Sequence, residues 1–175
     1  MPASVFIGTS IDGFIARSNG ALDFLPVDGG EPHGYDEFMA GIDALVVGRN
    51  TFETVLAFPE WPYGKKRVVV LSSRPIDFSA VRGGGIVEQM SGAPAEIIAK
   101  LAASGAHNLY IDGGITIQRF LRAGLIDRLI ITRVPVLIGE GIPLFAALPR
   151  DIKLRHIATQ SYASGLVKTE YRIDD

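Results

Sequence analysis

The sequence predicts an α/β domain whose sheet is mostly parallel, with an antiparallel edge formed by the C-terminal strands. Short apolar runs, typical of strands buried on both faces, alternate with segments whose apolar residues recur at helical spacing. The chain ends in two strand patterns joined by a Ser-Gly turn, which favours a hairpin. The predicted strands are residues 4–8, 43–48, 67–71, 85–88, 109–111, 128–135, 152–158 and 166–173. The predicted helices are residues 35–41, a segment from residue 49 onward, 93–103 and 115–121.

Length and composition indicate a single domain, residues 1–175, with a substantial core. The chain has 175 residues, 47% of them hydrophobic, and a positive mean hydropathy, which exclude a disordered chain. A net charge of -2 and a pI near 5.9 give no electrostatic reason to bind nucleic acid or an anionic membrane. No repeat or low-complexity tract divides the chain.

Several other classes of protein are excluded by what the sequence lacks. The N-terminus has no basic segment before its apolar run, and no apolar stretch is long enough to span a bilayer. There is no cysteine, and His33, His107 and His156 are scattered without ligand spacing, so we expect no metal site. We expect a cytoplasmic protein.

The stretch from residue 108 to 145 has the pattern strand, glycine pair, helix, strand. The first strand ends at Asp112, Gly113 and Gly114 turn the chain, and a helical pattern follows. Glycines let a phosphate approach the main chain, and free N–H groups at a helix start attract negative charge, so the pattern indicates a dinucleotide site. The full G-x-G-x-x-G spacing is absent, and an ordinary strand–helix turn fits this stretch equally well.

Two other predicted strands end in residues that suit a phosphate. Gly48 is followed by Arg49 and Thr51 at a helix start, and the strand at 67–71 is followed by two serines and Arg74. Cations and hydroxyls at the carboxyl ends of parallel strands lie where open α/β sheets bind ligands. A helix cap and a Ser-Pro turn with solvated arginines are the simpler explanations of each strand end taken alone.

Two loops complete the predicted site. The N-terminal loop (residues 9–26) is rich in Gly, Asp, Asn and Ser, and its Asp12-Gly13 pair is either a turn or the mouth of a site. The apolar loop (residues 134–145) contains glycines and prolines, and could cover a substrate pocket.

The order of these motifs resembles the dihydrofolate reductase-like superfamily, most closely its RibD C-terminal branch, the reductase domain of riboflavin biosynthesis. The resemblance rests on SIDGFIA, VVGRNTFE, VVVLSSRP, LYIDGG and GLIDRLIITRVPVLIGEGIPLF, in that order, and covers essentially the whole chain. It implies a three-layer sandwich with helices on both faces of the sheet. It also implies an oxidoreductase that uses NADPH.

The resemblance assigns a cofactor site to three turns. The turn at Arg49 would receive the cofactor phosphates, and the turn at Arg74 the adenosine 2′-phosphate, which favours NADPH over NADH. The glycine pair would meet the pyrophosphate and the nicotinamide side, and the resemblance implies a cis peptide between Gly113 and Gly114. The expected cofactor residues are Gly48, Arg49, Asn50, Thr51, Leu71, Ser72, Ser73, Arg74, Asp112, Gly113, Gly114, Ile115 and Thr116.

The resemblance also implies a substrate side. Asp12 is the expected catalytic residue, which orients the substrate or handles a proton. The expected substrate-binding residues are Asp12, Gly13, Phe38, Glu140, Gly141 and Leu144. The family substrate is 5-amino-6-(5-phosphoribosylamino)uracil. Candidates to hold its phosphate are Arg17, Lys65 and Arg133.

The chain departs from folate reductases on the first helix. Alignment on Phe38 puts Gly34 where those enzymes carry an acid, and Asp36 would point about 200° away from that position. The tryptophan motif of their entry loop is also absent. We therefore expect a reductase of a small heterocyclic or ribosylamino compound. The alternatives are a reductase with another substrate on the same scaffold and a catalytically silent nucleotide-binding protein. The apolar C-terminal edge favours a homodimer.

Overall fold

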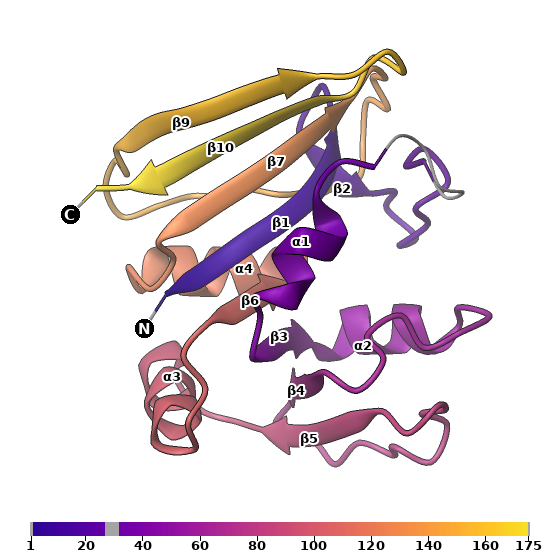
Figure 1. Ribbon diagram of the computed structural model, residues 1–175, viewed down its shortest axis with the longest axis vertical. Coiled ribbons are helices and arrows are strands. Elements are labelled where there is room, and N and C mark those ends of the chain that lie inside the picture. The colour runs from indigo at the N-terminus through magenta and orange to yellow at the C-terminus, as the bar shows by residue number, and fades with distance from the viewer. Residues whose placement is uncertain (1, 27–31, 175) are drawn as a thin grey trace.

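An eight-stranded sheet runs through the molecule in the order β5-β4-β3-β6-β1-β7-β10-β9 (Figure 1). The computed structural model describes residues 2–26 and 32–174. The strands of this sheet are β1 (Ala3–Ser10), β3 (Ala44–Gly48), β4 (Arg67–Leu71), β5 (Ile86–Met90), β6 (Leu109–Asp112), β7 (Arg128–Val134), β9 (Leu154–Ser161) and β10 (Val167–Ile173). Neighbours from β5 to β7 are parallel, whereas β10 is antiparallel to both β7 and β9. The predicted mixed sheet with an antiparallel C-terminal edge is confirmed.

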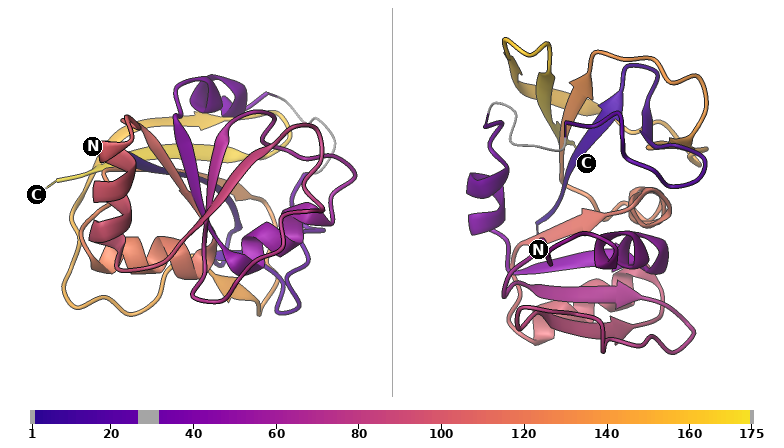
Figure 2. Two further views of the ribbon diagram at one scale, coloured as in Figure 1. Left: turned by 90° about the horizontal axis from the view of Figure 1, so that it is seen from below. Right: turned by 90° about the vertical axis from the view of Figure 1, so that its right-hand side faces the viewer.

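Helices cover both faces of the sheet, which confirms the three-layer arrangement. The helices are α1 (Tyr35–Ala40), α2 (Arg49–Leu56), α3 (Pro94–Ala103) and α4 (Gly114–Arg122). Successive residues of a strand point to opposite faces, so β3 sends Val46 into a core with α3 and α4, and Val47 into a second core with α1 and α2. Figure 2 shows α1 and α4 on opposite sides of the sheet. Both faces of the central strands are therefore buried, as their continuous apolar runs predicted.

A second, two-stranded sheet joins the N-terminal loop to the apolar loop. β2 (Phe14–Ala16) pairs antiparallel with β8 (Ile142–Pro143). The N–H of Leu144 donates to the carbonyl of Gly13 at 3.0 Å, and that of Ile11 to the carbonyl of Val136 at 2.9 Å. The sequence predicted loops for both segments. The pairing was missed because it is very short and joins parts of the chain far apart in sequence.

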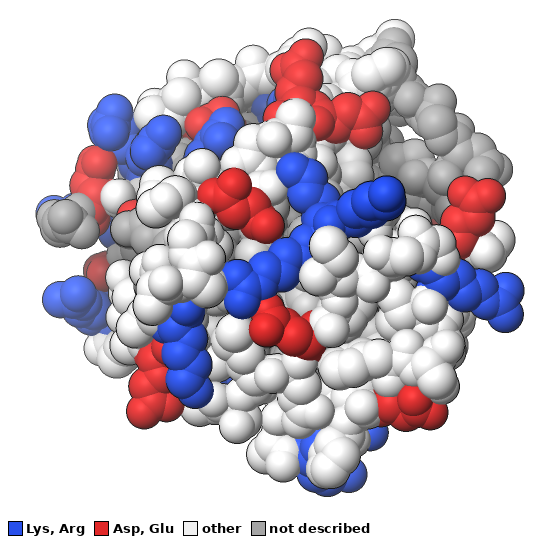
Figure 3. Space-filling model, turned by 60° about the horizontal axis from the view of Figure 1, so that its bottom comes forward, with Lys and Arg blue, Asp and Glu red and all other residues white. Residues whose placement is uncertain are grey.

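The edge of the large sheet that β9 forms is open. Every residue of β9 is exposed, including the apolar side chains of Leu154 and Ile157. At the opposite end, near β5 and α3, basic side chains form a band across the surface with acidic side chains on both sides of it (Figure 3). Within the described ranges, no helix has the length and apolar character needed to cross a membrane.

Candidate nucleotide and substrate site

A cavity of about 1020 Å³ lies toward the carboxyl ends of β1, β3, β4 and β6. Its walls include every residue expected from the sequence to hold a cofactor. These are Gly48, Arg49, Asn50, Thr51, Leu71, Ser72, Ser73, Arg74, Asp112, Gly113, Gly114, Ile115 and Thr116. Three turns that are distant in the sequence thus meet at one edge of the sheet, where parallel α/β sheets bind ligands.

The two glycine turns fit into each other. A Cβ on Gly113 would lie 2.5 Å from Oγ1 of Thr51, at the start of α2, and one on Gly48 would lie 2.9 Å from Oγ1 of Thr116, at the start of α4. Gly113 also has φ = 96°, a conformation that L side chains rarely adopt. Each glycine therefore makes room for the first turn of the neighbouring helix.

Both of these helices begin at the cavity without a side-chain cap. α2 starts at Arg49 and α4 at Gly114, and neither has a side-chain hydrogen bond at its N-cap. The first N–H groups of a helix have no partner within it, and the helix dipole adds partial positive charge there. The first turns of both helices line the cavity. They form a strong site for an anion such as a phosphate.

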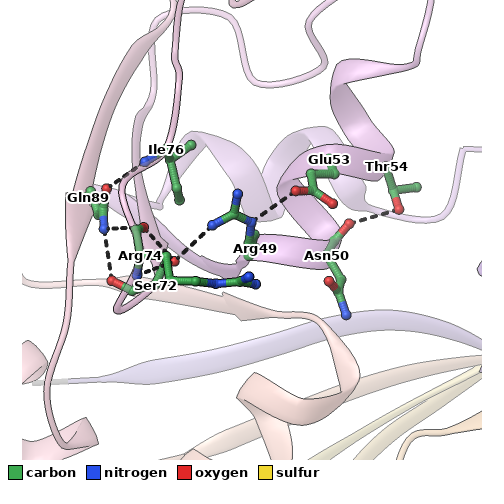
Figure 4. A network of polar contacts seen from close by, with 8 residues as sticks. All are labelled: Arg49, Asn50, Glu53, Thr54, Ser72, Arg74, Ile76 and Gln89. Carbon is green, nitrogen blue, oxygen red and sulfur yellow. Dashed lines mark hydrogen bonds and ion pairs between the residues drawn. The ribbon is translucent and has the colours of Figure 1, made fainter.

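A polar network holds the arginine turns in place (Figure 4). The amide of Gln89 donates to the carbonyls of Ser72 and Arg74 at 2.9 and 2.8 Å. Arg49 lies 3.0 Å from the carboxylate of Glu53 and donates to the hydroxyl of Ser72 at 3.4 Å. Arg74 extends its side chain toward the start of α2 (Figure 4), and no hydrogen bond or ion pair engages its guanidinium within residues 2–26 and 32–174. Its charge is available to a ligand.

One expectation for the glycine pair is wrong. The peptide between Gly113 and Gly114 is trans, like all other peptides of the described chain. The turn is made instead by the positive φ of Gly113, which lets the chain pass from β6 into α4.

Asp112 is a carboxyl group in the cavity wall next to the glycine pair. Removal from water raises its pKa to about 6, although the N–H of Gly113 donates to its carboxylate at 2.9 Å and opposes this shift. Three buried tyrosines nearby have raised pKa values, mainly because they are removed from water and secondly because of the charge of Asp112. The pKa of Tyr35 rises to about 12, and those of Tyr63 and Tyr110 rise as well. Asp112 thus changes protonation near neutral pH while the tyrosine hydroxyls keep their protons.

The part of the cavity nearest β1 is apolar. Phe6 packs edge-on against Tyr35 with their ring centroids 5.6 Å apart, and its carbonyl accepts a hydrogen bond of 2.8 Å from the hydroxyl of Tyr110. We call this part the aromatic end. It is formed by Phe6, Ile7, Gly8, Leu22, Leu25 and Tyr35. Sequence reasoning missed all six, since residues of a strand, a helix or a packed loop look the same whether they line a cavity or fill a core.

The residues expected to bind substrate lie beside the cavity, outside its lining. Phe38 packs between Phe6 and Tyr110, with centroid distances of 5.0 and 5.1 Å, and Leu144 is only 1% exposed. Asp12, Gly13, Glu140 and Gly141 belong to the two loops that β2 and β8 join. None of the six residues is in direct reach of a ligand in this cavity.

The Asp12 carboxylate binds the backbone of the apolar loop. It accepts hydrogen bonds from the N–H groups of Gly139 at 2.8 Å and Ile138 at 3.3 Å. The Ser10 hydroxyl and these two N–H groups hold the pKa of Asp12 below its usual value of 3.8. Asp12 therefore fastens one loop to the other.

We expect this fastening to be lost in acid. Because the folded-state pKa lies below 3.8, the contribution of Asp12 is present above pH 3.8 and disappears as the pH falls through the folded-state value. The NMR signal of the Gly139 amide should move upfield on that titration, and its hydrogen exchange should quicken in Asp12→Ala at pH 7. A Gly139 amide that does not respond to either change would contradict the bond.

The basic residues suggested for a substrate phosphate do not reach the cavity. Arg17 binds Asp23 with its Nε 2.6 Å from Oδ1, and neither Lys65 nor Arg133 belongs to the lining. Gly34 precedes α1 and Asp36 is exposed away from the cavity, as expected from the sequence.

The fold belongs to the dihydrofolate reductase-like class of folds. A dihydrofolate reductase from Enterococcus faecalis, complexed with NADP(H) and RAB-propyl, has the same fold with a TM-score of 0.67. It is 20% identical, and the match covers 99% of this chain and 97% of that one.

Within this class, the chain belongs to the RibD C-terminal domain family, whose model matches residues 4–168. It is similar to a Shewanella sp. PV-4 protein named for riboflavin biosynthesis, with 40% identity, a TM-score of 0.91 and full coverage of both chains. It is also 34% identical to the uncharacterized protein YwjB of Bacillus subtilis (strain 168), over 93% of this chain and 92% of that protein.

Proposed function

We propose that the protein is an NADPH-dependent reductase of a small heterocyclic or ribosylamino compound. The observation that carries this proposal is the meeting of two uncapped helix starts and two arginines at one end of a cavity whose other end is apolar. The first end suits a phosphorylated dinucleotide and the second a ring compound. Family membership supports the same assignment.

NADPH fits the polar end of the cavity by charge and by space. The first turns of α2 and α4 would hold the pyrophosphate, with the backbone accessible at Gly113 because it has no side chain. Ser72, Ser73 and Arg74 would hold the 2′-phosphate, since hydroxyls and an unengaged guanidinium suit a doubly charged group. The bound cofactor would supply a hydride.

Asp112 is the carboxyl group that we propose to supply the proton. It lines the cavity, its raised pKa keeps it protonated up to about pH 6, and it lies beside the glycine pair. Asp12, the residue favoured from the sequence, binds the apolar loop with both carboxylate oxygens. In this assignment Asp112 performs the role of the acid that folate reductases carry at the position of Gly34.

The first test is the preference for NADPH over NADH. In Arg74→Ala we expect the Kd for NADPH to rise about 10- to 100-fold, since hydrogen bonds between charged groups contribute about 1.5–3 kcal/mol, while the Kd for NADH stays within about twofold. Isothermal titration calorimetry measures both. Arg82→Ala, an exposed arginine outside the cavity lining, makes the same change of charge and should alter neither.

Two outcomes would decide against parts of the proposal. If the protein binds neither nucleotide, the reductase assignment fails and only the fold remains. If it binds NADPH but does not oxidise it with any uracil, pteridine or related ring compound, the protein is a nucleotide-binding protein without turnover, the alternative suggested by the missing helix acid.

A further inference from the structure

The aromatic end of the cavity indicates what kind of compound is reduced. Its walls are the rings of Phe6 and Tyr35, the side chains of Leu22 and Leu25, and backbone of β1. Leu25 closes against β1, with its Cδ2 3.1 Å from where a Cβ of Gly8 would lie. Such walls stack on a planar ring and exclude water from it.

The charged side chains of the cavity lie away from this end, with one exception. The three arginines of the lining come from α2, from the turn after β4, and from α4. Arg119 of α4 donates to the carbonyl of Gly92, beyond the end of β5, on the far side of the sheet order from β1. The charged group next to the aromatic end is Asp112, which becomes an anion above about pH 6.

His33 packs against Phe6 with ring centroids 5.7 Å apart, and two basic side chains from the same region are engaged elsewhere. Lys168 on β10 donates to the carbonyl of His33 at 2.7 Å, and Arg17 binds Asp23. Residues 27–31, outside the described ranges, have the sequence VDGGE and contain no lysine or arginine. The cavity lining from the N-terminal loop also includes the uncharged Ser18 and Asn19, but neither supplies a cation. A phosphate at this end would meet apolar walls and the Asp112 carboxylate, which disfavour it.

We infer that the substrate is an uncharged planar ring compound without a phosphate group, which separates this protein from an enzyme acting on a ribose 5-phosphate. The inference rests on the proposed function, because it takes the polar end as the cofactor's. The polar groups that would orient the ring are the Asp112 carboxyl and the Tyr35 hydroxyl, which keeps its proton because its pKa is raised to about 12.

A matched pair of compounds tests the inference: 5-amino-6-(ribosylamino)uracil and its 5′-phosphate, titrated by calorimetry into protein saturated with NADPH. We expect the unphosphorylated compound to bind at least as tightly and to be turned over with the higher kcat/KM. Binding of the phosphate at least about tenfold more tightly, the effect of one charge-assisted contact, would overturn the inference. So would a failure of both compounds, and of pterin and lumichrome, to bind.

Variants locate the ring at this end. Leu25→Lys places a cation on the apolar wall and should tighten binding of the phosphate about tenfold relative to the unphosphorylated compound. Leu148→Lys adds the same charge at an exposed leucine outside the cavity lining, and it should not change the ratio of the two affinities. A Leu25→Lys protein that does not distinguish the two compounds would put the ring elsewhere and overturn the inference.

The remaining control concerns Lys168, whose ammonium group donates to the carbonyl of His33. Lys168→Met should not change the ratio of the two affinities. A selective loss of affinity for the phosphorylated compound would show that Lys168 leaves His33 to bind the phosphate, and would overturn the inference.

Failure of the inference can be distinguished from failure of the proposed function. Absence of NADPH binding overturns the proposed function, whereas NADPH binding with a preference for the phosphorylated compound overturns only the inference.

Discussion

Gly113→Ala should lower the free energy of unfolding by about 2–6 kcal/mol, the sum of backbone strain and overpacking. The strain arises because φ is 96° at this position, and the overpacking because the new Cβ would lie 2.5 Å from Oγ1 of Thr51. Relief of that contact requires the Thr51 side chain or the start of α2 to move, and both belong to the phosphate-binding part of the cavity, so NADPH binding should weaken together with the stability. Urea unfolding and calorimetry measure the two effects.

Gly124→Ala separates strain from crowding. Gly124 has φ = 67° with no atom within 4 Å of the added Cβ, so its replacement should cost only about 1–2 kcal/mol and leave NADPH binding intact. Adding Thr51→Ala to Gly113→Ala removes the hydroxyl and should recover part of the stability. Equal losses in the two glycine variants would contradict the account of interlocked turns.

Asp112→Asn should lower kcat about 100- to 10,000-fold, the usual contribution of a positioned acid, and change the Kd for NADPH little. In the wild type, kcat/KM should fall as the pH rises above about 6, where Asp112 loses its proton, and this dependence should be absent in the variant. Asp36→Asn changes an exposed acid on α1 and should retain full activity, which also tests whether Asp36 replaces the missing helix acid.

Asp112→Asn should also be more stable than the wild type at pH 8. A folded-state pKa of about 6 instead of 3.8 means that stability falls as the pH rises between these values and stays reduced above them. Asparagine can still accept the N–H of Gly113 but carries no charge, so the free energy of unfolding should rise by roughly 2–3 kcal/mol at pH 8 and remain unchanged at pH 3. A variant that keeps both turnover and the pH profile would exclude Asp112 as the acid.

The sequence predicted the polar end of the cavity because chemistry and position coincide there. Gly48, Arg49, Arg74 and Gly113 each lie at or after the end of an apolar run that predicts a buried strand, and parallel strands bring their carboxyl ends to one edge. The resemblance to known reductases then assigned these residues to a cofactor. The structure gathers all of them around one cavity.

The aromatic end could not be predicted in this way. Phe6 and Tyr35 have the spacing of core residues, and only the packing of α1 and the N-terminal loop leaves them facing a cavity. The resemblance assigned Asp12 a catalytic role because the Asp-Gly pair matches the substrate loop of the family. Its partners Ile138 and Gly139 lie in a segment whose path no local pattern reveals. The homodimer suggested by the apolar C-terminal edge stays a prediction, to which the structure adds the full exposure of β9.

The pairing of β2 with β8 has a consequence for the order of events in folding. We expect these strands to meet after β1 and β7 lie side by side, because each follows one of them along the chain. Closing so long a loop for so few hydrogen bonds is unfavourable until the large sheet supplies the framework. On this expectation the wall of the cavity is assembled late, and a newly made chain gains its sheet before it gains a place for a ligand.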